Sequence, residues 1–199
     1  MNPVDFLKDI LHITDEQLLR KMTTLCEVRT IKKGEWLIRQ GQEPIRLYFL
    51  IEGIFRGSFI GVNGKDMTDC IVATCGMPLM ANSDICGIAQ IGIEALTKAT
   101  VLSIFLQDIM VLFPHFPILG QLYHSFLVWS SKMHWELKVI TYQYSASQRY
   151  QWFLETYPGL LDQISHKHVA SFLNMTPETL SKLIHTSGDI RDTDRVQSV

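Results

Sequence analysis

The sequence lacks an excess of charge of either sign. Its 18 lysines and arginines nearly balance 20 aspartates and glutamates, which gives a formal net charge of −2 at pH 7. Phosphate contacts supply much of the affinity of DNA-binding proteins, so this balance counts against strong binding to DNA. The sequence also lacks any stretch close to the roughly 18 apolar residues of a membrane span. We therefore expect no membrane association.

Patterns typical of secretion, metal binding and catalysis are missing as well. The first residues, MNPVDFLKDIL, carry charges and lack a signal-peptide layout, so we expect a cytoplasmic protein. The histidines form no HxxxH or HExxH pattern, and no nucleophile–base set or glycine-rich phosphate loop occurs. We predict neither an enzyme nor a bound cofactor or metal.

The four cysteines form no CxxC pair. In a cytosolic protein, isolated cysteines are more typical of small buried apolar residues. Three of them lie close together, so a thiol sensor or a metal site stays open as an alternative role. The cysteines are Cys26, Cys70, Cys75 and Cys86.

Short apolar runs separated by turns extend from Cys26 to about Phe105. Asn63-Gly64 between two of these runs is a strong hairpin signal. Many short strands at this spacing predict an antiparallel barrel or jelly roll. The predicted strands cover residues 28–31, 36–38, 47–51, 55–60, 68–73, 92–95 and 100–105. Before them, residues 14–17 have the capping-box pattern of a helix start.

A helical pattern begins near Leu112, and residues 118–144 contain no proline and only one glycine. Apolar residues recur there at spacings close to a heptad. A helix of about 40 Å is too long for a small barrel to cover completely. We predict that a partner helix covers it; the alternative is packing against its own barrel and C-terminal domain alone. The predicted dimer seam is Leu119, Leu122, Phe126, Trp129, Met133 and Ile140.

Residues 165–184, SHKHVASFLNMTPETLSKLI, have the pattern of a helix-turn-helix. Asn174 stands where the turn needs a positive φ, Thr176 is a good N-cap, and Pro177 suits the first helical position. The predicted inner faces are Val169, Ala170 and Leu173 on the first helix, and Leu180, Leu183 and Ile184 on the second. Glu178, Ser181, Lys182 and His185 should point outward. Taken alone, the pattern also fits an ordinary helical hairpin with a solvated polar face.

Another helix is predicted over residues 148–157, ended by Pro158-Gly159. From Ala146 to the end the chain has five basic and six acidic residues, so this region carries little positive charge. After Ser187-Gly188 the tail, DIRDTDRVQSV, is polar and charged, and we expect it to be poorly ordered.

This order of barrel, long helix and helix-turn-helix resembles the CRP/FNR family of bacterial transcription regulators over nearly the whole chain. The resemblance rests on residues 32–41 (KKGEWLIRQG), 47–53 (LYFLIEG) and 176–182 (TPETLSK). These are similar to the family's glycine-punctuated opening strands, to the strand and turn that follow, and to the start of its recognition helix. The resemblance implies a cyclic-nucleotide-binding fold, a homodimer, and an inverted-repeat operator in double-stranded DNA.

By position, the resemblance implies that Glu178 accepts a hydrogen bond from a cytosine amine, that Lys182 approaches guanine O6 or N7, and that Thr179 contacts phosphate. Pro177 and Lys182 stand where relatives often have arginine, whose bidentate fork lysine lacks. The expected DNA-binding residues are Thr176, Pro177, Glu178, Thr179, Ser181, Lys182 and His185. RNA polymerase and an unidentified small-molecule effector are further candidate partners.

The expected ligand pocket departs from the family. Cyclic-nucleotide binders have a phosphate cassette with Gly-Glu near its start and Arg-Ser or Arg-Thr at its end. Here Met77 takes the place of the glutamate, and no basic residue lies between Lys65 and Lys98. A buried phosphate without a cation is costly, so we predict that cyclic AMP and cyclic GMP do not bind in the usual way. The pocket is then either empty or holds an apolar metabolite. Its candidate residues are Gly76, Met77, Leu79, Ile91, Gly92 and Ile93.

The expected protein is an α+β regulator with three parts. Residues 1–112 form an N-terminal antiparallel β-barrel or jelly roll that serves as the effector domain, residues 113–145 a long dimerisation helix, and residues 146–199 a helix-turn-helix domain with a short polar tail. The predicted function is sequence-specific transcription regulation by a dimer. The alternative is a barrel-type sensor or scaffold that has lost DNA binding, which the near-neutral C-terminal region favours.

Overall fold

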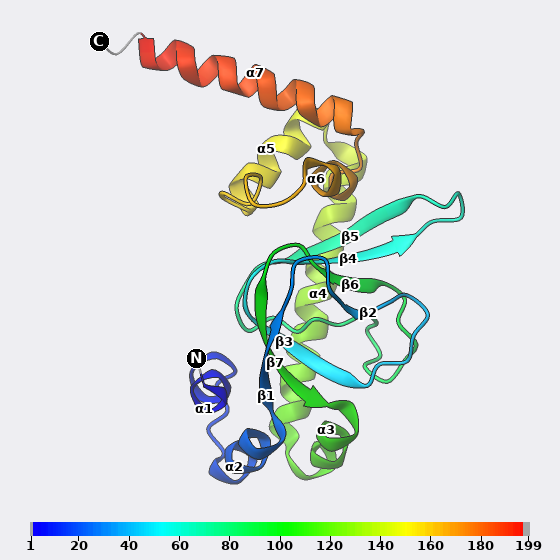
Figure 1. Cartoon of the computed structure of the whole chain (residues 1–199), viewed down its shortest axis with the longest axis vertical. Coiled ribbons are helices and arrows are strands. Elements are labelled where there is room, and N and C mark those ends of the chain that lie inside the picture. The colour runs from blue at the N-terminus through cyan, green and yellow to red at the C-terminus, as the bar shows by residue number, and fades with distance from the viewer. Residues whose placement is uncertain (1, 197–199) are drawn as a thin grey trace. The chain divides into compact units, whose positions relative to one another are not determined.

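The computed structural model describes the backbone of residues 2–196 and the side chains of residues 2–186 (Figure 1). The chain divides into two compact units, Met1–Lys132 and Met133–Val199, which are described separately. Among the described helices, none combines the length and the apolarity that crossing a membrane requires.

The first unit contains short N-terminal helices, two β-sheets and the start of a long helix. Its elements in chain order are α1 (Pro3–Asp5), the π-helical turn η1 (Phe6–Ile10), α2 (Glu16–Leu25), β1 (Glu27–Ile31), β2 (Trp36–Ile38), β3 (Arg46–Glu52), β4 (Phe55–Ile60), β5 (Asp66–Val72), β6 (Gly92–Ala95), β7 (Ala99–Phe105), α3 (Leu106–Leu112), the 3₁₀ turn η2 (Phe113–His115) and the first part of α4 (Pro117–Gln143).

The strands form a three-stranded sheet in the order β1-β7-β3 and a four-stranded sheet in the order β2-β6-β4-β5. Every neighbouring pair of strands is antiparallel. The predicted fold class and all seven predicted strands are therefore confirmed, each to within a residue or two. The hairpin at Asn63-Gly64 joins β4 to β5, and Gly64 has the positive φ of 76° that such a turn requires.

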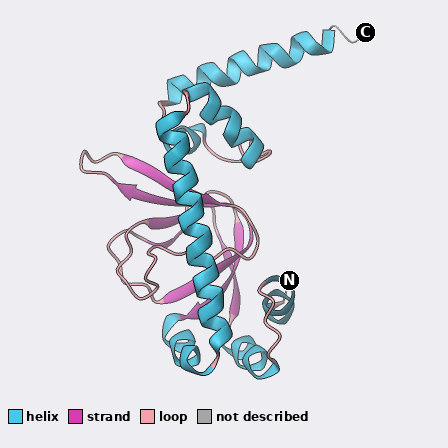
Figure 2. Cartoon of the chain, turned by 180° about the vertical axis from the view of Figure 1, so that it is seen from behind, coloured by secondary structure: helices cyan, strands magenta, loops and turns pink. Residues whose placement is uncertain are grey.

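Two hydrophobic clusters hold the first unit together. One lies between the two sheets and includes Leu50 and Phe55. The other joins the N-terminal helices, α3 and α4 to the outer face of β3, where the Phe49 ring lies 6.0 Å from that of Phe126 and 6.4 Å from that of Phe6. Figure 2 shows α4 crossing the strands of this unit on that face. The cap of α2 is Asp15, whose side chain accepts from the Leu18 amide, so the helix starts one residue later than the capping-box pattern of residues 14–17 predicts.

The long predicted helix is present as α4, and part of its predicted dimer seam packs within the first unit. Leu119 is buried, and Leu122 and Phe126 pack against the core of the same unit. Ile140 is 4% exposed, and Met133 is half-buried. The core of the first unit therefore uses Leu119, Leu122 and Phe126, of which Leu122 and Phe126 keep part of their surface exposed. Trp129, 42% exposed, is the member of the seam that faces solvent.

The second unit contains the end of α4 and the helices α5 (Ala146–Thr156), α6 (His166–Phe172) and α7 (Pro177–Val196). A capping box starts α5: the Gln148 amide donates to Ser145 Oγ over 3.3 Å, and Gln148 Oε1 accepts from the Ser145 amide over 2.9 Å. Rings from α5, the loop after it and α6 then pack together. These rings belong to Trp152, Phe153, Tyr157 and Phe172.

The last helix is longer than predicted. We expected an end at Ser187-Gly188 and a poorly ordered tail, but α7 continues to Val196. A glycine inside a helix costs only about 1 kcal/mol relative to alanine, which is too little to end a helix by itself. The side chains of residues 187–199 lie outside the described residues.

Candidate nucleic-acid interface

The turn between α6 and α7 has the predicted backbone. Asn174 adopts φ 50°, a left-handed conformation that asparagine tolerates better than other residues with a Cβ. Before it, the Leu173 amide donates to the Val169 carbonyl over 2.9 Å, and after it the Met175 amide donates to the Ala170 carbonyl over 2.9 Å. These bonds fix the direction in which α7 leaves the turn.

The start of α7 is capped as predicted. The Thr179 amide donates to Thr176 Oγ1 over 3.2 Å, and the two threonine hydroxyls lie 3.1 Å apart. The Leu180 amide donates to the Thr176 carbonyl over 3.1 Å. Pro177 occupies the first helical position, where a missing amide proton costs nothing. The first turn of α7 is therefore held by its cap.

The two helices separate apolar from polar residues. Val169, Ala170, Leu173 and Leu180 are buried, as predicted, while Leu183 and Ile184 are half-buried. On the opposite face the exposed residues are Thr176, Pro177, Glu178, Ser181, Lys182 and His185, and Thr179 is half-buried. The structure thus brings all the sequence-predicted DNA-binding residues onto one surface at the start of α7.

Glu178 presents a negative charge at this surface. Hydrogen bonds from its own backbone amide and from the Thr176 hydroxyl to its carboxylate hold its pKa below the ordinary value. The carboxylate is therefore an acceptor at neutral pH. It can accept from an amine of a base, and it repels a phosphate.

Arg149 braces the turn from α5, a role that the sequence analysis did not find. Its Nη1 donates to the Tyr144 carbonyl over 2.9 Å, and its Nη2 donates to the Asn174 carbonyl over 3.3 Å. Its Nε is buried and has no hydrogen-bond partner among the described residues. Nothing local in the sequence marks this contact, because Arg149 and Asn174 are 25 positions apart.

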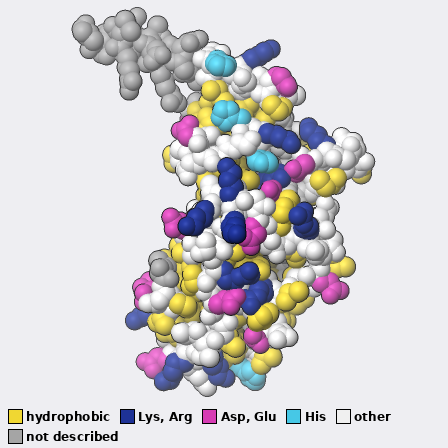
Figure 3. Space-filling view, viewed as in Figure 1, with side chains coloured by type: hydrophobic (Ala, Val, Ile, Leu, Met, Phe, Trp, Pro, Cys, Tyr) yellow, Lys and Arg dark blue, Asp and Glu magenta, His cyan; other side chains and the backbone are white. Residues whose placement is uncertain are grey.

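Little free positive charge remains near the exposed face of α7. Arg149 is occupied by backbone carbonyls, which leaves Lys167 on α6 and Lys182 on α7 as the exposed basic residues of these helices up to Thr186. On the face drawn in Figure 3, Lys and Arg side chains alternate with Asp and Glu instead of forming one basic patch. Any DNA contact here relies on hydrogen bonds and helix ends as well as on charge.

Most of the candidate effector residues pair or pack with neighbouring strands. The Gly76 amide donates to the Leu50 carbonyl over 2.8 Å, and the Met77 carbonyl accepts from the Leu50 amide over 2.9 Å. Gly76 and Met77 thus pair with the edge of β3 through their backbones. Gly92 lies against an indole ring, because a Cβ at this position would be 2.4 Å from Trp36 Cζ3. These three residues thus make structural contacts.

Ile91 and Ile93 are also part of the packing between the sheets. A Cβ on Gly57 would lie 2.6 Å from Ile91 Cδ1 and 2.6 Å from Cys70 Sγ. The side chains of Ile91 and Cys70 therefore fill the space that a side chain at position 57 would occupy. Ile93, on the inner strand β6, is buried in this core, and Ile91, just before β6, is half-buried and packs against it.

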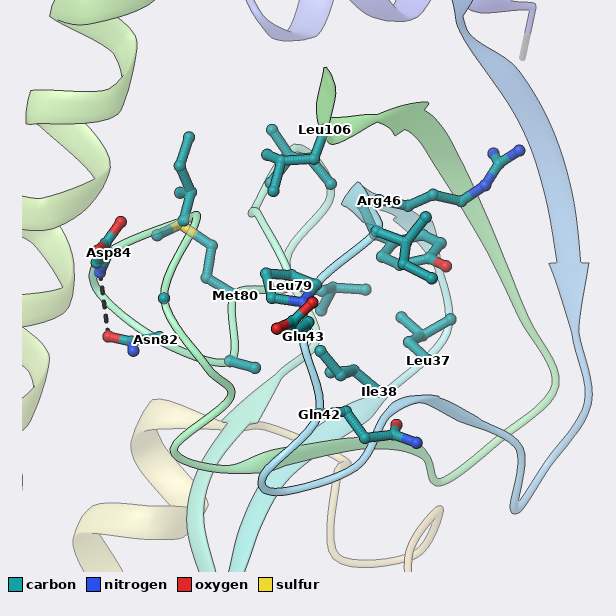
Figure 4. A pocket seen from close by; sticks show the side chains of 17 residues that line it. Leu37, Ile38, Gln42, Glu43, Arg46, Leu79, Met80, Asn82, Asp84 and Leu106 are labelled. Atoms are coloured by element: carbon teal, nitrogen blue, oxygen red, sulfur yellow. Dashed lines mark hydrogen bonds between the residues drawn. The ribbon is translucent and has the colours of Figure 1, made fainter. Parts of the chain in front are cut away.

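A pocket of about 580 Å³ opens elsewhere in the first unit, and Leu79 is the one candidate effector residue that lines it (Figure 4). Its walls come from β2, from residues 42–48 and from the segment 79–87 between β5 and β6. Met80 and Ile85, from that segment, contribute apolar surface. Leu106 at the start of α3 completes the wall.

No protein-family model matches the sequence, and no curated protein matches it. Solved structures do match. FixK2 from Bradyrhizobium japonicum aligns with a TM-score of 0.72 at 14% identity, over 82% of this chain and 86% of its own. The c-di-GMP-responsive regulator CLP from Xanthomonas campestris aligns with a TM-score of 0.68 at 12% identity, over 88% and 92%. The catabolite activator protein of Thermus thermophilus aligns with a TM-score of 0.53 at 18% identity, over 94% and 87%. The chain has the fold of the CRP/FNR family of regulators.

Proposed function

We propose that this protein is a dimeric, sequence-specific DNA-binding transcription regulator. The observation that carries the proposal is the α6–turn–α7 unit, with its capped first turn and an exposed face that is polar apart from Pro177. A helix presented in this way fits the major groove with its first turns against base edges. The fold supports the same conclusion.

In this proposal Glu178 accepts a hydrogen bond from a cytosine amine and Lys182 donates to guanine O6 or N7. Thr179 contacts phosphate, and Thr176, Pro177, Ser181 and His185 complete the surface. Residues 1–112 serve as the effector domain, residues 113–145 as the dimerisation helix and residues 146–199 as the DNA-binding domain.

The dimer contact is assigned to a different stripe of α4 from the one predicted. Val128, Trp135 and Tyr142 are seven residues apart and 39%, 64% and 80% exposed. Residues at this spacing share one side of a helix in a two-helix contact. We propose that the same stripe of a second copy covers these side chains. Two copies of α7 would then face two half-sites of an inverted repeat.

Selection from random DNA tests the proposal directly. The enriched sequence should be an inverted repeat with half-sites about 34 Å apart, one turn of the double helix. Lys182→Ala should relax the preference at one base pair and cost about 1–3 kcal/mol of binding free energy. Lys167→Ala is the matched control, because this exposed lysine lies on α6 and should alter affinity equally for all sequences. A uniform loss with Lys182→Ala would instead make Lys182 a phosphate contact.

The dimer has its own test in sedimentation measurements. Trp135→Ala should shift the protein toward a monomer, and Trp129→Ala should not, because Trp129 is exposed but lies off the stripe. A wild-type protein that is monomeric while it binds DNA would refute the α4 assignment.

The alternative function is a sensor or scaffold that no longer binds DNA. The occupation of Arg149 by backbone carbonyls favours it, because this removes one cation from an already near-neutral region. If no sequence is enriched even at low salt, this alternative replaces the DNA-binding proposal.

A further inference from the structure

The pocket at residues 42–48 and 79–87 has the dimensions of a small-molecule site. Its volume of about 580 Å³ falls within the roughly 300–1,000 Å³ of typical ligand pockets. Most of its lining is apolar, including side chains from both sheets, from the segment 79–87 and from α3. The apolar side chains labelled in Figure 4 are Leu37, Ile38, Leu79, Met80 and Leu106.

The charge available to a ligand in this pocket is negative. In Figure 4 the Glu43 carboxylate lies near the centre of the labelled side chains, and the Arg46 guanidinium points away from them. Arg46 is held outside by hydrogen bonds to Glu27 and, over 2.6 Å, to Ser103 Oγ, and it stacks 3.7 Å from the centre of the Phe105 ring.

The Glu43 carboxylate has no hydrogen bond or ion pair with any residue from 2 to 186. The second carboxylate of the lining, Asp84, accepts from the Cys86 amide over 3.0 Å. An anionic ligand would meet two negative charges here and no accessible cation. A cationic ligand would find an unpaired carboxylate beside apolar walls.

We propose that this pocket binds an organic cation, a primary ammonium group carried on an apolar chain. The ammonium group donates to the Glu43 carboxylate, and the chain packs on Leu79, Met80 and Leu106. The chain then continues into an adjoining groove of about 440 Å³, which shares Leu106 with the pocket and is also lined by Cys86.

The segment 79–87 lies between this pocket and α4. Met80 and Ile85 line both the pocket and a small apolar cavity of about 40 Å³, whose other walls include Leu122 and Phe126 of α4. The Tyr123 hydroxyl donates to the Ser83 carbonyl in the same segment. A ligand that shifts this segment therefore acts on the packing of α4. The regulatory meaning of that shift rests on the proposed function, whereas the binding itself does not.

A matched series of probes tests the chemistry of the ligand. Hexylamine, hexanol and hexanoate share one apolar chain and differ in the charge of the head group. Ligand-observed NMR titrations of the full chain should give hexylamine a dissociation constant about two- to five-fold lower than that of hexanol, as one exposed ion pair allows. Hexanoate should bind most weakly. Hexanoate binding as tightly as hexylamine would overturn the proposal.

Two glutamine variants locate the effect. Glu43→Gln should remove the preference for hexylamine over hexanol and leave hexanol binding unchanged. Glu52→Gln is the control, because Glu52 is exposed on β3 and does not line the pocket. The same preference in both variants and the wild type would exclude Glu43 as the partner. Circular dichroism shows whether each variant is folded, and neither change touches the core.

Two exposed thiols give an independent map of where the ligand lies. Cys86 borders the groove, whereas Cys75 is exposed but lines neither the pocket nor the groove. Saturating hexylamine should slow the alkylation of Cys86 by iodoacetamide and leave that of Cys75 unchanged, read by mass spectrometry of the peptides. Equal rates at Cys86 with and without hexylamine would overturn this placement. DNA takes part in none of these measurements, so their failure and a failure of DNA binding are distinguishable.

Discussion

Replacing Arg149 with methionine should loosen the turn in front of α7. The side chain makes two hydrogen bonds to carbonyls, 2.9 Å to Tyr144 and 3.3 Å to Asn174. Hydrogen bonds from a charged group contribute about 1.5–3 kcal/mol each. The second bond is long, the residue is half-exposed, and its buried Nε has no described partner, so we expect a total loss smaller than two full bonds would give, about 1–2 kcal/mol. Methionine keeps the length of the side chain and removes its donors.

Hydrogen exchange of individual amides measures this loss where it occurs. The amides of Leu173 and Met175 close the turn and should exchange about 5–30 times faster in Arg149→Met, since about 1.4 kcal/mol corresponds to a factor of ten. The amides of β7 in the first unit are the internal reference. Arg149→Lys keeps the charge but not the planar fork that reaches two carbonyls, so its effect should be intermediate. Unchanged exchange at the turn in Arg149→Met would refute the bracing role.

Two further predictions concern the first unit. Gly92→Ala should destabilise it by about 1–3 kcal/mol in chemical denaturation, because its Cβ would lie 2.4 Å from a Trp36 ring atom; Gly120→Ala, in open space on α4, should instead be neutral or stabilising by up to about 1 kcal/mol. Equal effects would show that Trp36 moves aside freely. Burial raises the thiol pKa values of Cys26 and Cys70 from 9.0 to about 12, so both should resist iodoacetamide at pH 8 until the protein is denatured. The thiol pKa values are higher in the folded protein than in the unfolded chain. The two thiols therefore favour folding below pH 9, and this contribution to stability is lost as the pH rises from 9 toward 12. Rapid alkylation of either in the folded protein would contradict the burial. The thiols expected to react are those of Cys75 and Cys86.

The turn of the helix-turn-helix was predictable because its determinants are local. Asn174 at a positive φ, the Thr176 cap and Pro177 in the first turn each follow from the chemistry of a single residue and its immediate neighbours. The bracing contact from Arg149 depends on how α5 packs beside the turn. Such a contact between distant positions leaves no pattern in one sequence.

The dimer seam shows the limit of periodicity. A heptad pattern identifies apolar positions that need cover, but it does not say what covers them. On α4 two apolar stripes coexist, and the one that contains Leu119 and Phe126 packs on the chain's own core. The stripe that stays exposed is marked by Trp135 and Tyr142, whose polar ring atoms make them less conspicuous in a hydrophobicity pattern. The two stripes differ in how deeply their side chains are buried, which the amino-acid composition of the helix does not reveal.

Most of the candidate effector residues likewise take part in packing that the sequence does not reveal. From the sequence, the cassette lacks a cation for a cyclic phosphate, which is an electrostatic obstacle. The structure adds a steric one, because Ile91 and Cys70 fill the space above Gly57 in the interior. Restoring an arginine in this segment would therefore not restore a pocket, since the two side chains would still occupy it. The open pocket beside Glu43 is therefore a better candidate for a ligand site than the cassette. Its free charge is a carboxylate, so the ligand expected there is a cation.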